Sequence, residues 1–409
     1  MAHRRLQATR QLNRLMTKHY LAARHFHPMR PIAYVSSGAP VEILRTMGFL
    51  PVYPENYTAL CGARKASLSL CQTAEAQGYS PDLCSYARTH LGAIADPSAA
   101  PMGGLPRPDL ILCCNNICGT ILKWFQTVSR LYDVPLFVLD TPYVKGKLKE
   151  ETINYVNTQL EKLIQALEKN FPRRYREARL RKVVALSNEA TALWRDIRYL
   201  CTARPSPLNA PDLFVNMAPM VVLRGTAAAV RYYRALKTEV EERVARGIGA
   251  VPVERYRLLW DNIAIWYELF RFHRYFERYD ACFVVDTYTG AWSGLVECDD
   301  PIRGLACTYT PILLNIGFAQ RAERMIDLIE AFQVDGFVMH ANRSCKPYSL
   351  GQYAIQRLVS ERTGVPGLIV EADMCDPRAY SESQLKTRIQ AFMETLSMRD
   401  SPYVGPRHL

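Results

Sequence analysis

The chain has 409 residues, of which 49% are hydrophobic and 22% are charged. This composition is typical of a globular protein with two or three packed units. No run of about 18 apolar residues is present, so we expect no membrane-spanning segment. The formal net charge of +12 raises the question of an anionic partner.

Basic residues gather in two parts of the chain. The first thirty residues predict a basic helix, which Pro31 ends, and they lack the apolar stretch of a secretory signal. We therefore expect a cytoplasmic protein. The basic clusters suit a nucleic acid, an anionic small molecule or simply two solvated helix faces, and solvated faces are the commonest case. No helix-turn-helix, zinc-finger or RNA-binding signature is present, so we expect no nucleic-acid partner. The second cluster consists of Arg173, Arg174, Arg176, Arg179, Arg181 and Lys182.

The first half of the chain alternates short apolar runs with helical patterns, as in an open parallel sheet. A helix is expected within residues 115–133, where apolar side chains recur at helical spacing. The expected strands cover residues 32–35, 49–53, 108–114 and 134–140.

The second half begins with a helical pattern over residues 150–200, which Pro172 interrupts. A proline-rich loop over 205–211 follows, and the aromatic-rich stretch 253–279 predicts another long helix. Strands are then expected at 281–286, 334–340 and 365–371, with helices at 350–363 and 383–396.

We therefore predict an α/β fold with two doubly wound Rossmann-like domains and an additional helical region. The predicted divisions are an N-terminal helix over 1–30, a first Rossmann-like domain over 31–150, a helical region over 151–252 and a second Rossmann-like domain over 253–409.

An internal repeat supports the two related domains. In the first half, Asp109 starts an apolar strand, Cys118 follows it, and a Val-Pro pair then precedes a second strand. In the second half, Asp335 and Cys345 stand in the same relation to a second Val-Pro pair. Because ligands bind at the carboxyl ends of parallel strands, this repeat predicts that the two cysteines face one site.

Twelve cysteines are present, and a cytosolic chain keeps them reduced, so most are expected to be small buried residues. Cys118 and Cys345 stand out because each falls near a helix start, where backbone N–H groups favour a thiolate. Cys84 is a third candidate, since Ser80 and Pro81 predict a helix start just before it. Three such thiolates suggest an iron–sulfur cluster.

Five segments together resemble the 2-hydroxyacyl-CoA dehydratase and benzoyl-CoA reductase family, most closely the alpha-type subunit of an (R)-2-hydroxyacyl-CoA dehydratase. They extend over almost the whole chain, and their order makes the resemblance specific. The segments are Ser-Gly-Ala-Pro-Val-Glu at 37–42; Tyr-Pro-Glu-Asn at 53–56 with Cys-Gly-Ala at 61–63; Gly-Tyr-Ser-Pro-Asp-Leu-Cys-Ser-Tyr at 78–86; Asn-Asn-Ile-Cys at 115–118; and His-Ala-Asn-Arg-Ser-Cys-Lys-Pro-Tyr at 340–348 with Glu-Ala-Asp at 371–373.

The resemblance implies a [4Fe-4S] cluster held by Cys84, Cys118 and Cys345, with the fourth iron open to water or substrate. It implies a lyase of anaerobic metabolism that removes water from a 2-hydroxyacyl-CoA through a ketyl radical. It also implies a heterodimer with a homologous second subunit, and an ATP-dependent iron–sulfur activator that injects the electron. By the same resemblance, Glu55 matches an acid near the substrate and Ser37 a substrate-contacting hydroxyl. The excess of arginine would then suit a CoA nucleotide or a partner surface.

Three alternatives remain open at this level. A benzoyl-CoA reductase subunit would use the same kind of cluster to reduce an aromatic ring. A non-catalytic electron-transfer protein of the same fold would bind more iron than one cubane. As structural residues, Ser37 would be a turn or N-cap serine, Glu55 a capping or salt-bridge carboxylate, and the cysteines core side chains.

Overall fold

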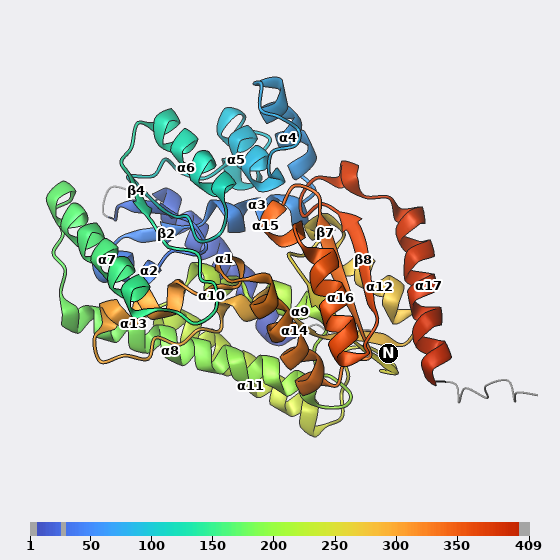
Figure 1. Ribbon diagram of the computed structural model, residues 1–409. Coiled ribbons are helices and arrows are strands. Elements are labelled where there is room, and N and C mark those ends of the chain that lie inside the picture. Colours follow the sequence, from blue (N-terminus) through green and yellow to red (C-terminus); the bar gives the residue numbers. More distant parts are fainter. Residues whose placement is uncertain (1–5, 26–29, 401–409) are drawn as a thin grey trace, which may run out of the picture.

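The computed structural model describes residues 6–25 and 30–400 and contains two four-stranded parallel sheets (Figure 1). The first sheet has the strand order β2-β1-β3-β4 and the second the order β6-β5-β7-β8. The two orders are equivalent strand by strand, which confirms the predicted α/β fold of two Rossmann-like units. The strands are β1 (Ile32–Val35), β2 (Leu50–Val52), β3 (Leu110–Cys114), β4 (Leu136–Leu139), β5 (Tyr256–Asp261), β6 (Ala281–Asp286), β7 (Gly336–Asn342) and β8 (Gly367–Ala372).

The internal repeat extends to a specific hydrogen bond at the start of equivalent strands. The Asp109 carboxylate, just before β3, accepts a hydrogen bond from the backbone N–H of Ile32 on β1 at 2.7 Å. The Asp335 carboxylate, just before β7, accepts one from the backbone N–H of Arg257 on β5, also at 2.7 Å. Each acid therefore ties the start of its strand to the neighbouring strand.

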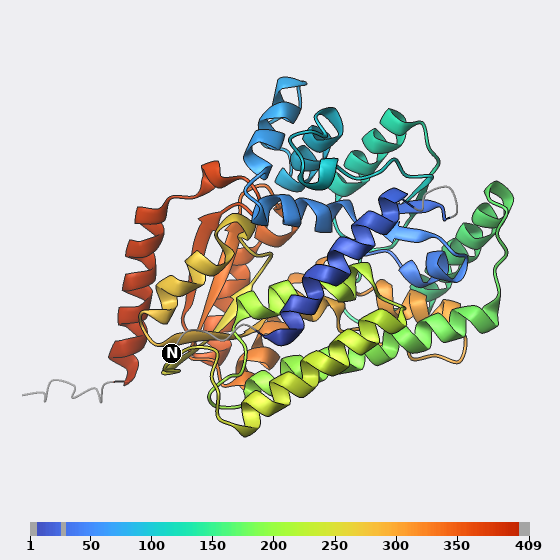
Figure 2. The same ribbon diagram turned by 180° about the vertical axis from the view of Figure 1, so that it is seen from behind.

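Six of the described helices come from the first third of the chain. They are α1 (Gln7–His25), α2 (Val41–Thr46), α3 (Pro54–Ala63), α4 (Ser67–Ala76), α5 (Ser85–Ala95) and α6 (Gly119–Tyr132). Among them, α2 and α6 make the main contacts with the first sheet. Figure 2 shows α1 crossing the back of the molecule, with α4 and α5 above it. The predicted N-terminal helix is α1; residues 1–5 and 26–29 of that prediction lie outside the described residues.

The expected helical region follows β4 and packs against both sheet-bearing parts. Helix α8 contacts α11, α2 and α13, and Figure 1 shows α8 and α11 side by side. Its helices are α7 (Glu150–Asn170), α8 (Glu177–Tyr199), α9 (Ala210–Asn216), α10 (Ala218–Val222) and α11 (Ala227–Ala245). The exact division points proposed at 31, 151 and 253 stay predictions.

The remaining helices surround the second sheet. They are α12 (Leu269–Glu277), α13 (Pro301–Tyr309), α14 (Phe318–Phe332), α15 (Lys346–Ser349), α16 (Gln352–Thr363) and α17 (Glu382–Asp400). Among the helices described, none combines the length and apolarity that crossing a bilayer requires.

The long helix predicted over residues 253–279 is wrong. The segment instead forms β5, a short 3-10 turn over Trp266–Glu268 and then α12. Strand β5 lies between β6 and β7 and is buried along its whole length. A strand that is covered on both faces has no alternation of polar and apolar residues, so its pattern resembles that of a buried helix.

Candidate functional site

A cavity of about 280 Å³ lies where the carboxyl ends of the two sheets meet. Its lining comes in part from residues that follow the strands of both sheets and in part from α1, α9 and α10. The structure brings all five predicted site residues into this lining: Ser37 after β1, Glu55 after β2, Cys84 before α5, Cys118 after β3 and Cys345 after β7.

Each of the three candidate cysteines occupies the N-cap position of a helix. Cys84 precedes α5, Cys118 precedes α6 and Cys345 precedes α15. The Cys118 sulfur accepts a hydrogen bond from the backbone N–H of Ile121 at 3.3 Å. This N–H and the helix dipole favour negative charge on that sulfur.

The helix start predicted at Ser80 is wrong by about one turn. The Ser80 hydroxyl accepts a hydrogen bond from the backbone N–H of Asp82 at 3.2 Å, but this bond closes a turn, and the helix begins at Ser85. Consequently Cys84 lies at the N-cap, where its side chain faces the cavity, and not within the first helical turn.

The three thiols are close enough to affect one another. Burial raises the pKa of Cys84 well above its usual range, and the Cys345 and Cys118 sulfurs raise it further. Burial and the Cys118 sulfur raise the pKa of Cys345 to about 12. As free side chains they are therefore thiols at neutral pH, whereas a bound cationic group would hold them as thiolates.

Three cysteine side chains in one cavity lining are donors of the kind that iron–sulfur clusters take. Within residues 6–25 and 30–400, no three His, Cys, Asp or Glu side chains converge on one point as ligands of a single metal ion do. The cysteines of an iron–sulfur cluster bind different irons, so they need to surround one volume without converging on one point. Cys84, Cys118 and Cys345 all belong to the lining of this one cavity.

The other cysteines lie outside the cavity lining. Cys113 and Cys114 are buried within β3, so of the three neighbouring cysteines only Cys118 reaches the cavity. Cys201 and Cys282 are fully buried at a different place, where their sulfurs contact backbone carbonyls of Ile197 and Leu208.

The Glu55 side chain connects the start of α3, just after β2, to the loop that follows β1. Its carboxylate accepts a hydrogen bond from the backbone N–H of Ser37 at 2.7 Å, although Glu55 itself stands in the first turn of α3. Burial raises the pKa of Glu55 to about 7, against the opposing effect of the hydrogen bonds from Ser37. Near neutral pH this carboxyl group can therefore either give or take a proton.

A hydrogen-bonded chain connects the Cys84 and Cys345 segments. The backbone N–H of Ser85 donates to the Ser344 hydroxyl at 3.0 Å, and that hydroxyl donates to the Asp373 carboxylate. The same carboxylate also accepts the backbone N–H groups of Cys375 and Asp376, both at 2.9 Å. Sequence reasoning missed this role of Ser344 and Asp373, although both lie in segments that carried the family resemblance.

A buried ion pair forms another part of the cavity wall. The Arg224 guanidinium donates to the Glu42 carboxylate at 2.8 Å, and both side chains are almost fully buried. The hydroxyl groups of Ser187 and Tyr309 donate to the same carboxylate at 2.9 Å each. This carboxylate thus joins α2, α8 and α13 to the segment after α10. Glu42 ends the first of the five family-like segments, but sequence reasoning assigned no role to it and did not indicate its pairing with Arg224.

The second basic cluster lies apart from the cavity. Arg173, Arg174, Arg176, Arg179 and Lys182 border a separate hollow of about 580 Å³ beside Met47. None of these residues contributes to the cavity that the cysteines line.

Comparisons with known proteins agree with the resemblance seen in the sequence. The family described as 2-hydroxyglutaryl-CoA dehydratase, D-component, matches residues 36–396. The chain is 33% identical to the (R)-2-hydroxyisocaproyl-CoA dehydratase alpha subunit of Clostridioides difficile over 373 residues, which cover 90% of this chain and 91% of the relative. It is 32% identical to the (R)-phenyllactyl-CoA dehydratase alpha subunit of Clostridium sporogenes, with 89% of each chain covered.

A reductase is also among the relatives. One of the subunits of the benzoyl-CoA reductase of Thauera aromatica is 30% identical, over 88% of this chain and 87% of the relative. The family match and the dehydratase alpha subunits nevertheless cover nearly all the segments that line the cavity. The chain belongs to the 2-hydroxyglutaryl-CoA dehydratase D-component family.

Proposed function

We propose that this chain is the alpha-type subunit of an (R)-2-hydroxyacyl-CoA dehydratase, a lyase that removes water from a 2-hydroxyacyl thioester of CoA. The observation that carries the proposal is one cavity, between two equivalent sheets, that is lined by three N-cap cysteines, Ser37 and Glu55. The similarity to dehydratase alpha subunits supports the same reaction type.

Cys84, Cys118 and Cys345 would hold a [4Fe-4S] cluster in this cavity. When bound, such a cluster supplies a Lewis acid and a one-electron carrier, for a reaction that passes through a ketyl radical of the thioester. The three cysteines fit the cluster because they line one cavity, where Cys345 is buried and Cys84 and Cys118 are partly buried.

Glu55 would donate a proton to the substrate, and Ser37 would orient the Glu55 carboxyl group. A hydroxide ion is a poor leaving group, and a carboxylic acid that is protonated near neutral pH can deliver the proton that turns it into water. The Ser37 N–H fixes the orientation of the Glu55 carboxyl group, so the proton is presented from a defined position. The aromatic side chains of the lining, such as Tyr86, Trp266 and Tyr288, would limit the entry of water.

The proposed reaction would need two further proteins. The relatives are named as alpha subunits, so a homologous second subunit would complete a heterodimer. Injection of one electron would require an ATP-dependent iron–sulfur activator. Anaerobic purification would be needed, because reduced clusters with an open iron react with oxygen.

The proposal is tested by measuring iron, acid-labile sulfide and the electron paramagnetic resonance spectrum of anaerobically purified protein. About four irons per chain are expected, as one cubane requires. A 2-hydroxyacyl-CoA should perturb the signal, and the activated two-subunit enzyme should form the 2-enoyl-CoA. A folded protein without iron that also fails to bind the thioester would rule the proposal out.

The similarity to a component of benzoyl-CoA reductase makes ring reduction the second candidate. Product analysis separates the two reactions, because dehydration leaves a 2-enoyl-CoA and ring reduction leaves a partly saturated ring. Formation of a reduced ring from benzoyl-CoA, without dehydration of any 2-hydroxyacyl-CoA, would favour the reductase.

Ser344 is expected to keep the cluster ligands in place. In Ser344→Ala, the Ser85 N–H loses its acceptor, and a buried donor without a partner costs about 1–3 kcal/mol. We expect a lower melting temperature and faster loss of iron to a chelator. Ser69→Ala is the control, because the Ser69 hydroxyl bonds only locally, to the Ala66 carbonyl at 3.1 Å, and Ser69 lies outside the cavity lining. Equal iron release from both variants would contradict this role.

A further inference from the structure

The charges that line the cavity restrict the substrate that it can hold. Among the described residues that form its wall, Glu55 is the only acid and Arg224 the only lysine or arginine. No histidine or aspartate of the described ranges contributes to the lining. A substrate with a second negative group would therefore have one cation at most available to bind it.

Arg224 is already fully engaged. Its Nε donates to Glu42 at 2.8 Å, and its Nη2 donates to the backbone carbonyl of Gly294 at 3.0 Å. Its Nη1 points to the Met220 sulfur at 3.5 Å and to the carbonyl of Trp292 at 3.4 Å. Glu42 is fully buried, so the pair is electrically balanced within the protein, and Arg224 has no free charge to offer a substrate carboxylate.

The wall formed by α9 and α10 is apolar. Phe214 on α9, Met217 at the junction of the two helices and Val221 on α10 belong to the lining and are each less than 5% exposed. Ile263 and Leu313 extend the apolar surface from the second sheet side. A carboxylate placed against this wall would lose its hydration without gaining a partner, which is strongly unfavourable.

We infer that the 2-hydroxyacyl group accepted by this cavity carries an uncharged, apolar side chain, branched aliphatic or aromatic, and that a dicarboxylic acyl group is excluded. Val221 on α10 sets the size of this side chain by direct contact. The inference rests on the proposed dehydratase function, which leaves the acyl group open.

The substrate class is tested on the activated two-subunit enzyme with three thioesters. We expect kcat/KM for 2-hydroxyisocaproyl-CoA or phenyllactyl-CoA to exceed that for 2-hydroxyglutaryl-CoA by at least about 100-fold. Calorimetric binding of isocaproyl-CoA and glutaryl-CoA, which lack the 2-hydroxyl and are not turned over, should show the same preference without catalysis.

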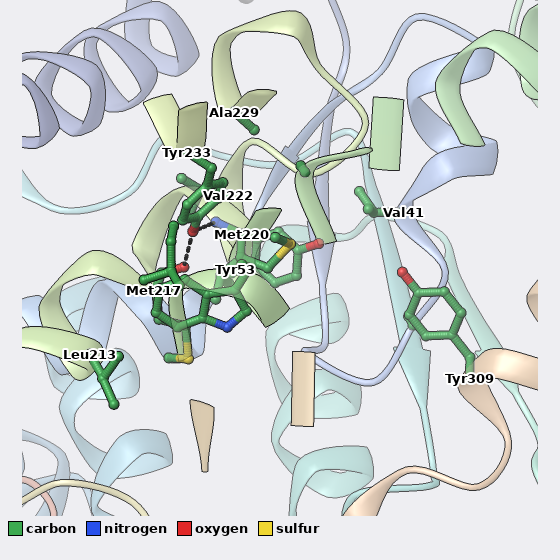
Figure 3. Close-up of a cluster of buried hydrophobic side chains, with 14 of the residues drawn as sticks. Val41, Tyr53, Leu213, Met217, Met220, Val222, Ala229, Tyr233 and Tyr309 are labelled. Atoms are coloured by element: carbon green, nitrogen blue, oxygen red, sulfur yellow. Dashed lines mark hydrogen bonds between the residues drawn. The ribbon is translucent and has the colours of Figure 1, made fainter. Parts of the chain in front are cut away.

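Val221 and Val222 offer a matched pair of variants. Val221 lines the cavity, whereas its neighbour Val222 is fully buried outside the lining, in the cluster with Ala229 and Tyr233 (Figure 3). Val221→Ala is expected to shift the phenyllactyl to isocaproyl ratio of kcat/KM by about 10-fold toward the larger side chain. Val222→Ala should lower stability and leave this ratio unchanged.

The outcomes separate the inference from the function on which it rests. Equal or better use of 2-hydroxyglutaryl-CoA would overturn the inference and leave the dehydratase function standing. Equal ratios in the two valine variants would overturn the assignment of Val221. If none of the thioesters binds or is dehydrated, the proposed function fails and the inference fails with it.

Discussion

Replacing Cys345 with serine is expected to remove most of the iron from the protein. Cys345 is the candidate ligand contributed by the second sheet, and the cavity lining holds only two further cysteines among the described residues. A serine oxygen is a much weaker ligand for iron than a thiolate. Iron and sulfide analysis of the anaerobically purified variant should therefore fall from about four irons per chain to well below half of that value.

Cys201→Ser and Cys282→Ser are the controls for this measurement. Both residues are fully buried, as a structural cysteine would be, yet neither lines the cavity. We expect both variants to keep their iron, even where the buried hydroxyl lowers the melting temperature. If all three variants contain equal iron, Cys345 is a core residue and the proposed set of ligands is wrong.

Replacing Glu55 with glutamine is expected to lower turnover by roughly 100-fold or more while the iron content stays unchanged, since general acid–base groups contribute about 10²–10⁴-fold. Glutamine preserves the shape of the side chain and can still accept the Ser37 N–H, but it cannot deliver a proton. Because the pKa of Glu55 is raised to about 7, the proton-donating form should disappear as the pH rises through 7. Full turnover in the variant would return Glu55 to a structural role.

The same carboxyl group is expected to reduce stability in alkaline solution. Its folded-state pKa of about 7 lies above the unfolded value of 4.5, so the folded state binds the proton more tightly. Stability is therefore lost as the pH rises from about 4.5 to 7, and the loss is complete above that range. At pH 8 the Glu55→Gln variant should unfold at a higher urea concentration than the unmodified protein, so the substitution that removes activity should stabilise the fold. A lower unfolding midpoint would indicate a stabilising role for the ionised carboxylate.

Most strands could be predicted because they are short apolar runs between turn residues. The expected strands at 32–35 and 281–286 agree with the bounds of β1 and β6. Strand β5 was missed because its apolar run continues into aromatic residues at helical spacing. The internal repeat could have indicated this strand. In the first half, β1 begins 77 residues before Asp109, and the same separation counted back from Asp335 falls near residue 257. The structure agrees, since the hydrogen bond from Ile32 to Asp109 spans 77 residues and that from Arg257 to Asp335 spans 78.

Cys118 and Cys345 could be predicted as cavity residues because strand ends in parallel sheets converge. Ser37 and Glu55 were predicted from the family resemblance, and in the structure they too follow strands and reach the same edge. The contacts of Ser344 with Ser85 and of Arg224 with Glu42 join segments that are 259 and 182 residues apart. Such pairs depend on how helices pack around the sheets, which local patterns do not encode.

The three cavity cysteines come from two different parts of the fold, and this affects how those parts separate when the protein unfolds. Cys84 and Cys118 belong to the part around the first sheet and Cys345 to the part around the second. A group bonded to all three would be a chelate that spans both parts, and its binding free energy would be coupled to their closed arrangement. Loss of a single ligand would then weaken the contact between the parts, admit solvent and speed the loss of the remaining two.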